Sequence, residues 1–199
     1  MRILAVDPGL TRCGVGVIET GAGRRVTFVD VFVIQTSPVM PLTERLHTIH
    51  EELRGALATH VPHLVAVERV FAQHNVRTVM GTAQASGVVL ALAGGANLTV
   101  AMHTPSEVKA AVTGNGRANK AQVAFAVRQI LSLDEARMLP DATDALALAL
   151  CAAWRREMAT PPHGALAGHA SAAVVPPLTP AQQLWRDAES RARRATPRS

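Results

Sequence analysis

The amino-acid sequence predicts an α/β fold in which helices flank a mixed five-stranded sheet. Three strand-like segments come first and are joined by short turns, which is typical of an antiparallel meander. Helical and strand-like segments then alternate, and this order adds parallel strands through crossover helices. These two observations together indicate a sheet whose strands run in both directions.

The first three strands are expected at residues 2–7, 13–19 and 25–34. Residues 2–7 form a nearly continuous apolar run, as expected of a strand that is covered on both faces. Pro8-Gly9 then forces a turn. The second and third segments are rich in β-branched and aromatic residues, and a short glycine-containing connection joins them.

The remaining elements follow from apolar periodicity and from helix-end signals. One buried helix face after Pro41 is indicated by the spacing of Leu42, Leu46, Ile49, Leu53 and Leu57. Asn119 and Gln122 have the spacing of a capping box at a helix start. In chain order, we expect a helix from residue 42, a strand at 63–68, a helix at 75–93, a strand at 98–102, and helices at 105–112, 119–131 and 141–157.

The 199 residues are predicted to form one domain, residues 1–158, followed by a tail. Residues 159–199 are rich in proline, alanine and arginine and lack periodic apolar positions, so we expect them to be mostly disordered. No apolar stretch reaches the ~18 residues of a membrane span, and the N-terminus has no secretory signal pattern. We therefore expect a cytoplasmic protein, in which Cys13 and Cys151 are packed thiols.

The chain is basic, with a net charge of +5 and a pI near 10.5. A basic protein suits an acidic polymer such as nucleic acid, although an arginine- and alanine-rich genome explains the composition equally well. The chain has only two lysines, Lys109 and Lys120, and both lie near one glycine-containing loop. Their position distinguishes them from the general arginine background.

Four acidic residues stand at positions where packing alone gives them no role. Asp7 and Glu68 each end an apolar strand, whereas Asp141 and Asp144 lie in the first turn of the last helix. If the first and fourth strands are neighbours, Asp7 and Glu68 emerge side by side at the strand carboxyl ends, where open α/β sheets place their sites. Asp141 and Asp144 are three residues apart and share a helix face.

A site made only of carboxylates indicates a divalent metal and phosphoryl chemistry, here the hydrolysis of a phosphodiester. Simpler interpretations remain open for three acids. Asp141 is a favourable charge in a first helical turn, Asp144 can face solvent, and Asp7 can be a turn residue before Pro-Gly. Glu68 is harder to explain without a ligand, because burying a charge is costly unless it is paired or binds a metal.

The histidine pairs predict no competing metal centre. His47 and His50 share a helix face, and His60 and His63 flank the start of a strand. Neither pair is accompanied in the sequence by a cysteine pair or a third ligand, so zinc is not expected.

Four sequence blocks occur in a specific order. They are residues 1–16 (MRILAVDPGLTRCGVG), 67–71 (VERVF), 112–123 (VTGNGRANKAQV) and 141–147 (DATDALA). In this order the blocks resemble the family of RuvC Holliday junction resolvases, and the resemblance covers about residues 1–158. Many relatives end near the last helix and lack the long tail, so the resemblance implies nothing about its role.

The resemblance implies a ribonuclease-H-like fold and a homodimer that resolves four-way DNA (Holliday) junctions by paired symmetric nicks, in homologous recombination and DNA repair. It implies Mg²⁺ as the cofactor, with two ions per subunit and Mn²⁺ as a substitute. It also implies cooperation with the branch-migration proteins RuvA and RuvB.

The resemblance assigns roles to residues at matching positions. Those it implies to be catalytic and metal-binding are Asp7, Glu68, Asp141 and Asp144, and those it implies to contact DNA are Phe71, Lys109, Arg117 and Lys120. Phe71 is implied to approach unstacked bases near the crossover, although a core aromatic beside a strand end is also consistent with the sequence. The lysines are implied to face the DNA backbone near the scissile phosphate, and a solvated surface is their simpler alternative.

Three other functions remain open from the residues alone. The first is a related nuclease that acts on RNA or on another branched substrate. The second is an actin-like phosphotransferase, whose two lobes need more chain than about 158 structured residues supply. The third is a non-catalytic protein that recognises bent or branched DNA, against which the four acids argue.

Overall fold

The computed structural model describes residues 1–69, 76–134, 140–155, 159–160 and 183. The strands are β1 (Arg2–Asp7), β2 (Arg12–Thr20), β3 (Val26–Gln35), β4 (Leu64–Glu68), β5 (Thr99–His103) and β6 (Ala159–Thr160). The helices are α1 (Leu42–His60), α2 (Val76–Gly95), α3 (Pro105–Thr113), α4 (Lys120–Leu131) and α5 (Pro140–Trp154). This order agrees with the α/β pattern that the sequence predicts.

The strands form one mixed sheet in the order β3-β2-β1-β4-β5-β6. The antiparallel meander β1-β2-β3 is as predicted. β1 also pairs in parallel with β4, which meets the condition for Asp7 and Glu68 to lie side by side. Ala159 and Thr160 pair antiparallel with β5. These first two residues of the predicted tail therefore join the sheet, and the strand count is six where the sequence predicted five.

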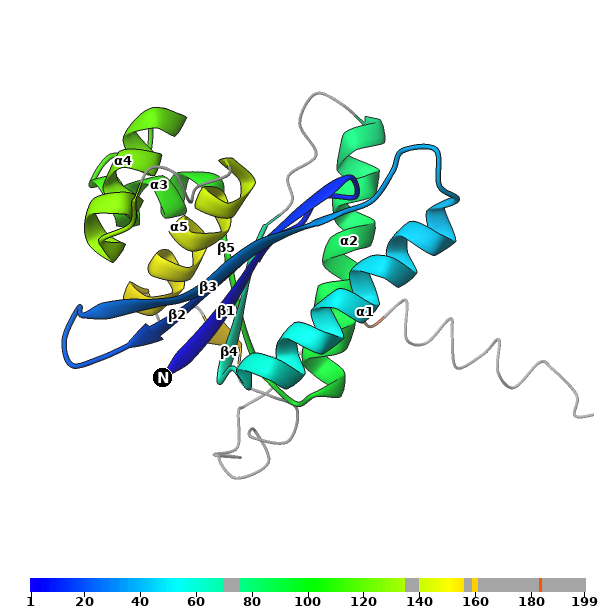
Figure 1. The fold of residues 1–199 in the computed structure, drawn as a ribbon, viewed down its shortest axis with the longest axis horizontal. Coiled ribbons are helices and arrows are strands. Elements are labelled where there is room, and N and C mark those ends of the chain that lie inside the picture. Colours follow the sequence, from blue (N-terminus) through cyan, green and yellow to red (C-terminus); the bar gives the residue numbers. More distant parts are fainter. Residues whose placement is uncertain (70–75, 135–139, 156–158, 161–182, 184–199) are drawn as a thin grey trace, which may run out of the picture. The chain divides into compact units, whose positions relative to one another are not determined.

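Helices cover both faces of the sheet (Figure 1), with α1 and α2 on one face and α3, α4 and α5 on the other. Alternate residues of β1 pack to opposite faces, so that Ile3 and Ala5 meet the α5 side while Leu4 and Val6 meet the α1 side. Burial on both faces is the reason why this strand is apolar throughout. Asp7 interrupts that pattern at the strand end.

The capping box that the sequence predicts is present at the start of α4. The Asn119 side chain accepts from the Gln122 amide, and the Gln122 side chain accepts from the Asn119 amide. The predicted start of α2 at Asn75 lies outside the described residues. α5 ends at Trp154, three residues earlier than predicted, because the chain must return to the edge of β5 by residue 159.

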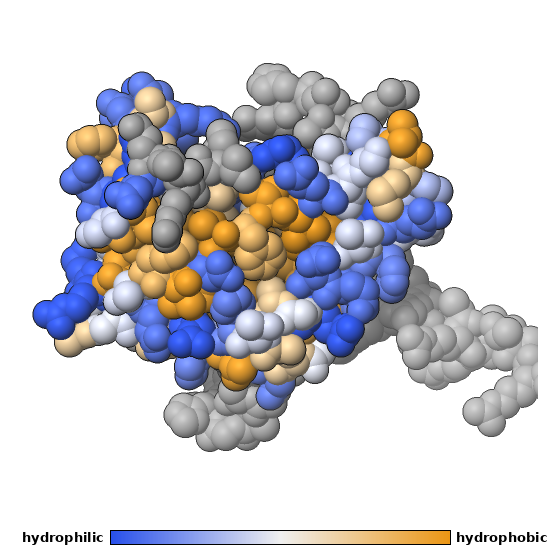
Figure 2. Space-filling view, viewed as in Figure 1, coloured by the Kyte–Doolittle hydropathy of each residue, from blue (hydrophilic) through white to orange (hydrophobic). Residues whose placement is uncertain are grey.

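The edge strand β3 leaves apolar side chains partly exposed. Figure 2, in the same view as Figure 1, shows hydrophobic side chains across the middle of the visible face and hydrophilic side chains around them. Val29 and Phe32 are among the half-buried residues that pack against the core from β3. Both cysteines are buried and unpaired, as expected of packed thiols. Within the described part of the chain, no helix is both long and apolar enough to cross a membrane.

Candidate active site at the carboxyl end of the sheet

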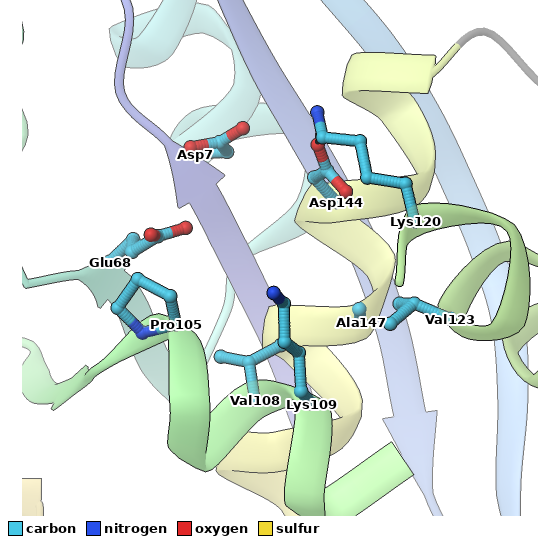
Figure 3. A pocket seen from close by; sticks show the side chains of 9 residues that line it. All are labelled: Asp7, Glu68, Pro105, Val108, Lys109, Lys120, Val123, Asp144 and Ala147. Carbon is cyan, nitrogen blue, oxygen red and sulfur yellow. Dashed lines mark hydrogen bonds and ion pairs between the residues drawn. The ribbon is translucent and has the colours of Figure 1, made fainter. Parts of the chain in front are cut away.

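Two acidic side chains meet at the carboxyl ends of adjacent strands. β1 ends at Asp7 and β4 ends at Glu68, and the preceding residues Val6 and Val67 are paired in parallel register. Because side chains alternate along a strand, both acids point to the face that α5 covers. Both line the same pocket, as Figure 3 shows. The parallel pairing of β1 and β4 therefore brings these two acids together.

α5 contributes a third carboxylate to the pocket. Asp144 lies near the start of this helix and lines the pocket together with Asp7 and Glu68. The next turns of α5 are almost completely buried against the sheet, from Ala145 to Ala152. This apolar burial fixes the helix, and the helix in turn fixes the position of Asp144.

Two glycines on β2 allow α5 to approach the sheet closely. A Cβ on Gly14 would lie 2.3 Å from the carbonyl oxygen of Asp141, and a Cβ on Gly16 would lie 2.9 Å from the amide nitrogen of Leu146. Any side chain at either position would therefore displace the helix. Gly14 is also paired with Asp7. The sequence interpretation treated these glycines only as strand residues, although a glycine within a strand is a signal of close backbone approach.

Asp141 lies at the same end of α5 but does not line the pocket. Its carboxylate accepts a hydrogen bond from Nε of Arg12, the first residue of β2. It remains close enough to Asp7 to raise the pKa of that carboxyl. Arg12 is thus a neighbour of the acidic cluster that sequence reasoning missed, and nothing in its turn sequence distinguishes it from the other arginines.

The two lysines of the chain enter the pocket from neighbouring helices. Lys109 comes from α3 and Lys120 from the start of α4, and both line the pocket with the acids. Lys120 Nζ lies 3.1 Å from Asp144 Oδ2. The hydrogen bond to Asp144, followed by its charge, raises the pKa of Lys120. Both lysines therefore lie beside the acids, and the Lys120 side chain is 82% exposed at the mouth of the pocket.

The acids in the pocket carry more negative charge than their neighbours neutralise. Burial, followed by the charges of Asp144 and Asp141, raises the pKa of Asp7 from 3.8 to about 6. Burial, followed by Asp7 and Asp144, raises the pKa of Glu68 from 4.5 to about 7. Lys120 opposes both shifts without cancelling them. Carboxylate oxygens with uncompensated charge suit a hard divalent cation rather than a soft metal. Within the described residues, no three of these acids have ligand atoms that all lie within 4.8 Å of one another, so the side chains would have to close around an ion.

One further buried polar residue lies beside the acids. His103 ends β5 in register with Glu68 and is fully buried. Within the described structure, neither of its ring nitrogens has a hydrogen-bond partner. Burial is the first cause that lowers its pKa. A neutral imidazole at this position leaves the negative charge of Glu68 uncompensated, and the sequence analysis gave this residue no role.

Of the other two predicted DNA contacts, the structure describes one. Phe71 falls outside the described residues. Arg117 is exposed in the loop between α3 and α4 and is not among the pocket residues. Its amide donates to the Asn115 side chain at 2.9 Å, which shapes that loop. The structure thus separates Arg117 from the two lysines.

Through Asp7 and Glu68, we expect the metal-free chain to become less stable as the pH rises from about 4 to about 7. The raised pKa values of Asp7 and Glu68 mean that the folded chain holds more protons than the unfolded chain over this interval. Raising a carboxyl pKa from 3.8 to about 6 costs up to about 3 kcal/mol once the group is ionised. Thermal unfolding followed by circular dichroism in the presence of a chelator measures the trend.

Asp7→Asn should remove part of this pH dependence and raise the unfolding temperature of the metal-free chain near pH 8 by several degrees, about 2–4 °C per kcal/mol. Glu52→Gln is the matched control, since Glu52 is an exposed acid on α1. Mg²⁺ should stabilise the wild-type chain more than the Asp7→Asn variant. The lowered pKa of His103 acts on both chains, so the test is the difference between them: an unchanged pH dependence in Asp7→Asn would contradict the shift assigned to Asp7.

This fold and this pocket define a class of protein. A mixed sheet with clustered carboxylates at its carboxyl ends, and lysines facing them, is typical of a metal-dependent nuclease with a ribonuclease-H-like fold. Residues 3–152 match the family model described as crossover junction endodeoxyribonuclease RuvC. The chain belongs to this family, and the phosphotransferase and the non-catalytic DNA-binding alternatives are thereby excluded.

Relatives and solved structures agree with the assignment. The chain is 52% identical over 191 residues to the RuvC protein of Leifsonia xyli subsp. xyli, which covers 95% of this chain and 92% of the relative. It is 57% identical over 158 residues to that of Mycobacterium avium, covering 79% and 84%. A structure of Thermus thermophilus RuvC in complex with Holliday junction substrate matches with a TM-score of 0.75 and 36% identity, covering 81% of this chain and 99% of that one.

Proposed function

We propose that this chain resolves four-way DNA junctions by paired symmetric nicks, in homologous recombination and DNA repair. One observation carries the proposal: Asp7, Glu68 and Asp144 meet the two lysines of the chain in a single pocket. The chain is also 36% identical to T. thermophilus RuvC, which has been solved with a Holliday junction substrate. The reaction is hydrolysis of one phosphodiester in each of two opposed strands.

Asp7, Glu68, Asp141 and Asp144 are the proposed metal ligands and catalytic residues. They would hold two Mg²⁺ ions per subunit, with Mn²⁺ as a substitute, and bound Mg²⁺ supplies activation of water and stabilisation of the leaving oxygen. The carboxylates supply negative charge and orientation. Asp141 is paired with Arg12 through one carboxylate oxygen in the structure, and we propose that it turns toward this cluster when metal binds. Arg12 is then free to face the DNA backbone.

The DNA contacts are proposed to divide between the cleavage point and the surrounding surface. Lys109 and Lys120 would face the scissile phosphate, because they line the pocket with the acids. Arg117 would contact the backbone outside the pocket, and Phe71 would approach unstacked bases near the crossover. Such aromatic contacts stabilise an unpaired base by stacking.

A nicking assay tests the proposal directly. The full chain with Mg²⁺ is incubated with a synthetic four-way junction, a linear duplex of the same sequence and an RNA–DNA hybrid. We expect symmetric paired nicks in the junction alone. Equal cutting of the linear duplex would show that the chain does not select for junction structure. Cutting of the hybrid alone would favour the related nuclease that acts on RNA.

A homodimer is the proposed assembly, because a junction with near two-fold symmetry presents two equivalent strands. α2 offers a suitable face. Residues 79–95 contain no charged side chain, and Met80 and Leu90 are 54% and 36% exposed. Ala83 and Gly87 lie between them at helical spacing and are also exposed. This uncharged stripe would allow the close approach of a second copy of α2.

Ala83→Glu combined with Leu90→Glu should convert the dimer to a monomer. Charges facing each other across the dyad cost about 3 kcal/mol, so the dissociation constant should rise at least about 100-fold. Sedimentation of the free protein measures this change, and Ala58→Glu on the exposed surface of α1 is the control. A wild-type chain that is monomeric both free and bound to a junction would exclude the dimer.

Two further assignments rest on the family resemblance, and one rests on the proline-, alanine- and arginine-rich composition of residues 159–199. We propose RuvA and RuvB as the partners that deliver the junction, and the cytoplasm as the compartment. Residues beyond Thr160 are proposed to act as a separate tail rather than as part of the nuclease domain. Pull-down of RuvA and RuvB with the full chain and with a variant truncated after Thr160 separates a contact through the nuclease domain from one through the tail.

A further inference from the structure

A second set of possible metal ligands lies on α1, outside the carboxylate pocket. His47, His50 and Glu51 each offer one ligand atom, and these atoms all lie within 4.8 Å of one another. We propose that this triad is a transition-metal site that binds Zn²⁺. It is separate from the acidic cluster, and the proposal does not depend on the function assigned to that cluster.

The triad follows from the geometry of the helix. Positions 47, 50 and 51 are related by i, i+3 and i+4, which places the three side chains on one face. The rings of His47 and His50 are nearly parallel, with centroids 6.4 Å apart and an interplanar angle of 12°. The histidine spacing alone predicts no third ligand, and the structure supplies Glu51.

The ligand atoms are close to the separations that zinc requires. His50 Nδ1 lies 2.9 Å from Glu51 Oε1. Tetrahedral Zn²⁺ with bonds of about 2.0–2.1 Å separates neighbouring ligand atoms by roughly 3.3 Å. The ion therefore needs only small side-chain rotations to replace this hydrogen bond. His47 is exposed and the other two are half-buried, so the site is open to solvent and can keep a water as its fourth ligand.

Arg54 prepares the carboxylate of the triad for binding. Arg54 Nη2 donates to Glu51 Oε2 at 2.6 Å, whereas Oε1 lies 2.9 Å from His50 Nδ1 and accepts only a longer bond of 3.4 Å from Arg54 Nε. The hydrogen bond from Arg54, followed by that from His50, lowers the pKa of Glu51 to about 2. Metal sites usually contain such a residue, which hydrogen-bonds to a ligating carboxylate and fixes its orientation.

Ligand chemistry separates the two sites. The sheet-edge cluster presents oxygen only and suits Mg²⁺, whereas two imidazoles and one carboxylate favour Zn²⁺. His50 also lines the groove between α1 and α2 together with Gln84 and Gly87. The α1 site thus lies at the rim of a groove that borders the uncharged stripe of α2.

Calorimetric titration of the full chain with ZnCl₂ in excess Mg²⁺ tests the proposal. Excess Mg²⁺ competes for sites made of oxygen alone, and the histidine variants identify the part of the zinc signal that belongs to the triad. We expect His47→Ala, His50→Ala and Glu51→Gln each to weaken zinc binding at least about tenfold. Glu52→Gln, an exposed neighbour on the same helix, should bind as the wild type does. Asp7→Asn should also leave this zinc affinity unchanged.

A second measurement locates the ion. Substoichiometric Zn²⁺ should perturb the ring-proton NMR signals that disappear in the His47→Ala and His50→Ala variants. Unchanged zinc affinity in the double variant would assign binding to other histidines of the chain and overturn the proposal. Absence of zinc binding to the wild-type chain would overturn it as well.

Discussion

Asp7→Asn should abolish junction cutting while leaving junction affinity within about twofold of wild type. Asp7 is the acid at the centre of the cluster, because it lies beside Glu68 on the next strand and is coupled to Asp144 and Asp141. The amide keeps the shape of the side chain but removes its charge. Without that charge the pocket holds a divalent ion poorly, and the single-turnover rate should fall at least about 1000-fold, or about 4 kcal/mol.

Binding should survive because it rests on phosphate contacts spread over the protein surface. Glu68→Gln and Asp141→Asn are expected to behave as Asp7→Asn does, with Asp144→Asn also severe. The measurements are single-turnover nicking rates with Mg²⁺ and junction affinities from gel shifts. Glu52→Gln should cut at the wild-type rate, which controls for the loss of one surface charge. If the variant of Asp7, Glu68 or Asp141 cuts at the normal rate, that residue is not a metal ligand.

Asp141 allows a finer test of the cluster. In the structure it is paired with Arg12 rather than turned into the pocket. If metal draws Asp141 away from Arg12, Arg12→Ala should preserve metal-dependent cutting far better than Asp141→Asn does. Equal losses in the two variants would instead show that the ion pair itself builds the site.

The strands themselves and the place of two acids at their ends were predictable from local sequence, whereas the neighbour relation of β1 and β4 was only a condition. Asp7 and Glu68 each end an apolar strand, and parallel neighbours bring their carboxyl ends to one edge of the sheet. The capping box at Asn119 was likewise local and is confirmed. These features depend on periodicity and on residue type within a few positions, which is the information that one sequence carries.

The missed features depend on contacts between distant segments. Gly14 matters because α5 packs onto it, and Arg12 because Asp141 is its neighbour across 129 residues of chain. Sequence spacing offers no means of pairing such positions. β6 was missed because Ala159 and Thr160 lie in a proline- and alanine-rich stretch, and two residues are too few to form a strand pattern. The role of Gly14, the role of Arg12 and the pairing of β6 all depend on tertiary packing.

The lysines should affect the rate of cutting more than the affinity for the junction. Lys109→Ala and Lys120→Ala each remove a positive charge beside the acids, where charge develops on the scissile phosphate. We expect the single-turnover rate to fall about 10- to 100-fold, or about 1.4–2.8 kcal/mol. The salt dependence of binding should change by about one unit at most, because one phosphate contact among many is lost.

Arg117→Ala is the matched control, because Arg117 is exposed and lies outside the pocket. It should weaken binding and reduce the salt slope while leaving the cutting rate of the bound junction unchanged. Lysine variants with normal rates and reduced affinity would behave as Arg117→Ala does. That result would show that the lysines hold DNA without acting on the scissile phosphate.

The two lysines should also differ from each other in their pH dependence. Lys120 lowers the pKa of both Asp7 and Glu68, whereas Lys109 lowers that of Glu68 only. Removing Lys120 therefore makes both acids harder to ionise, and protons compete with Mg²⁺ up to a higher pH. The pH at which cutting reaches half its maximum should shift upward in Lys120→Ala more than in Lys109→Ala. Equal shifts would mean that the contact of Lys120 with Asp144 does not persist when metal and DNA are bound.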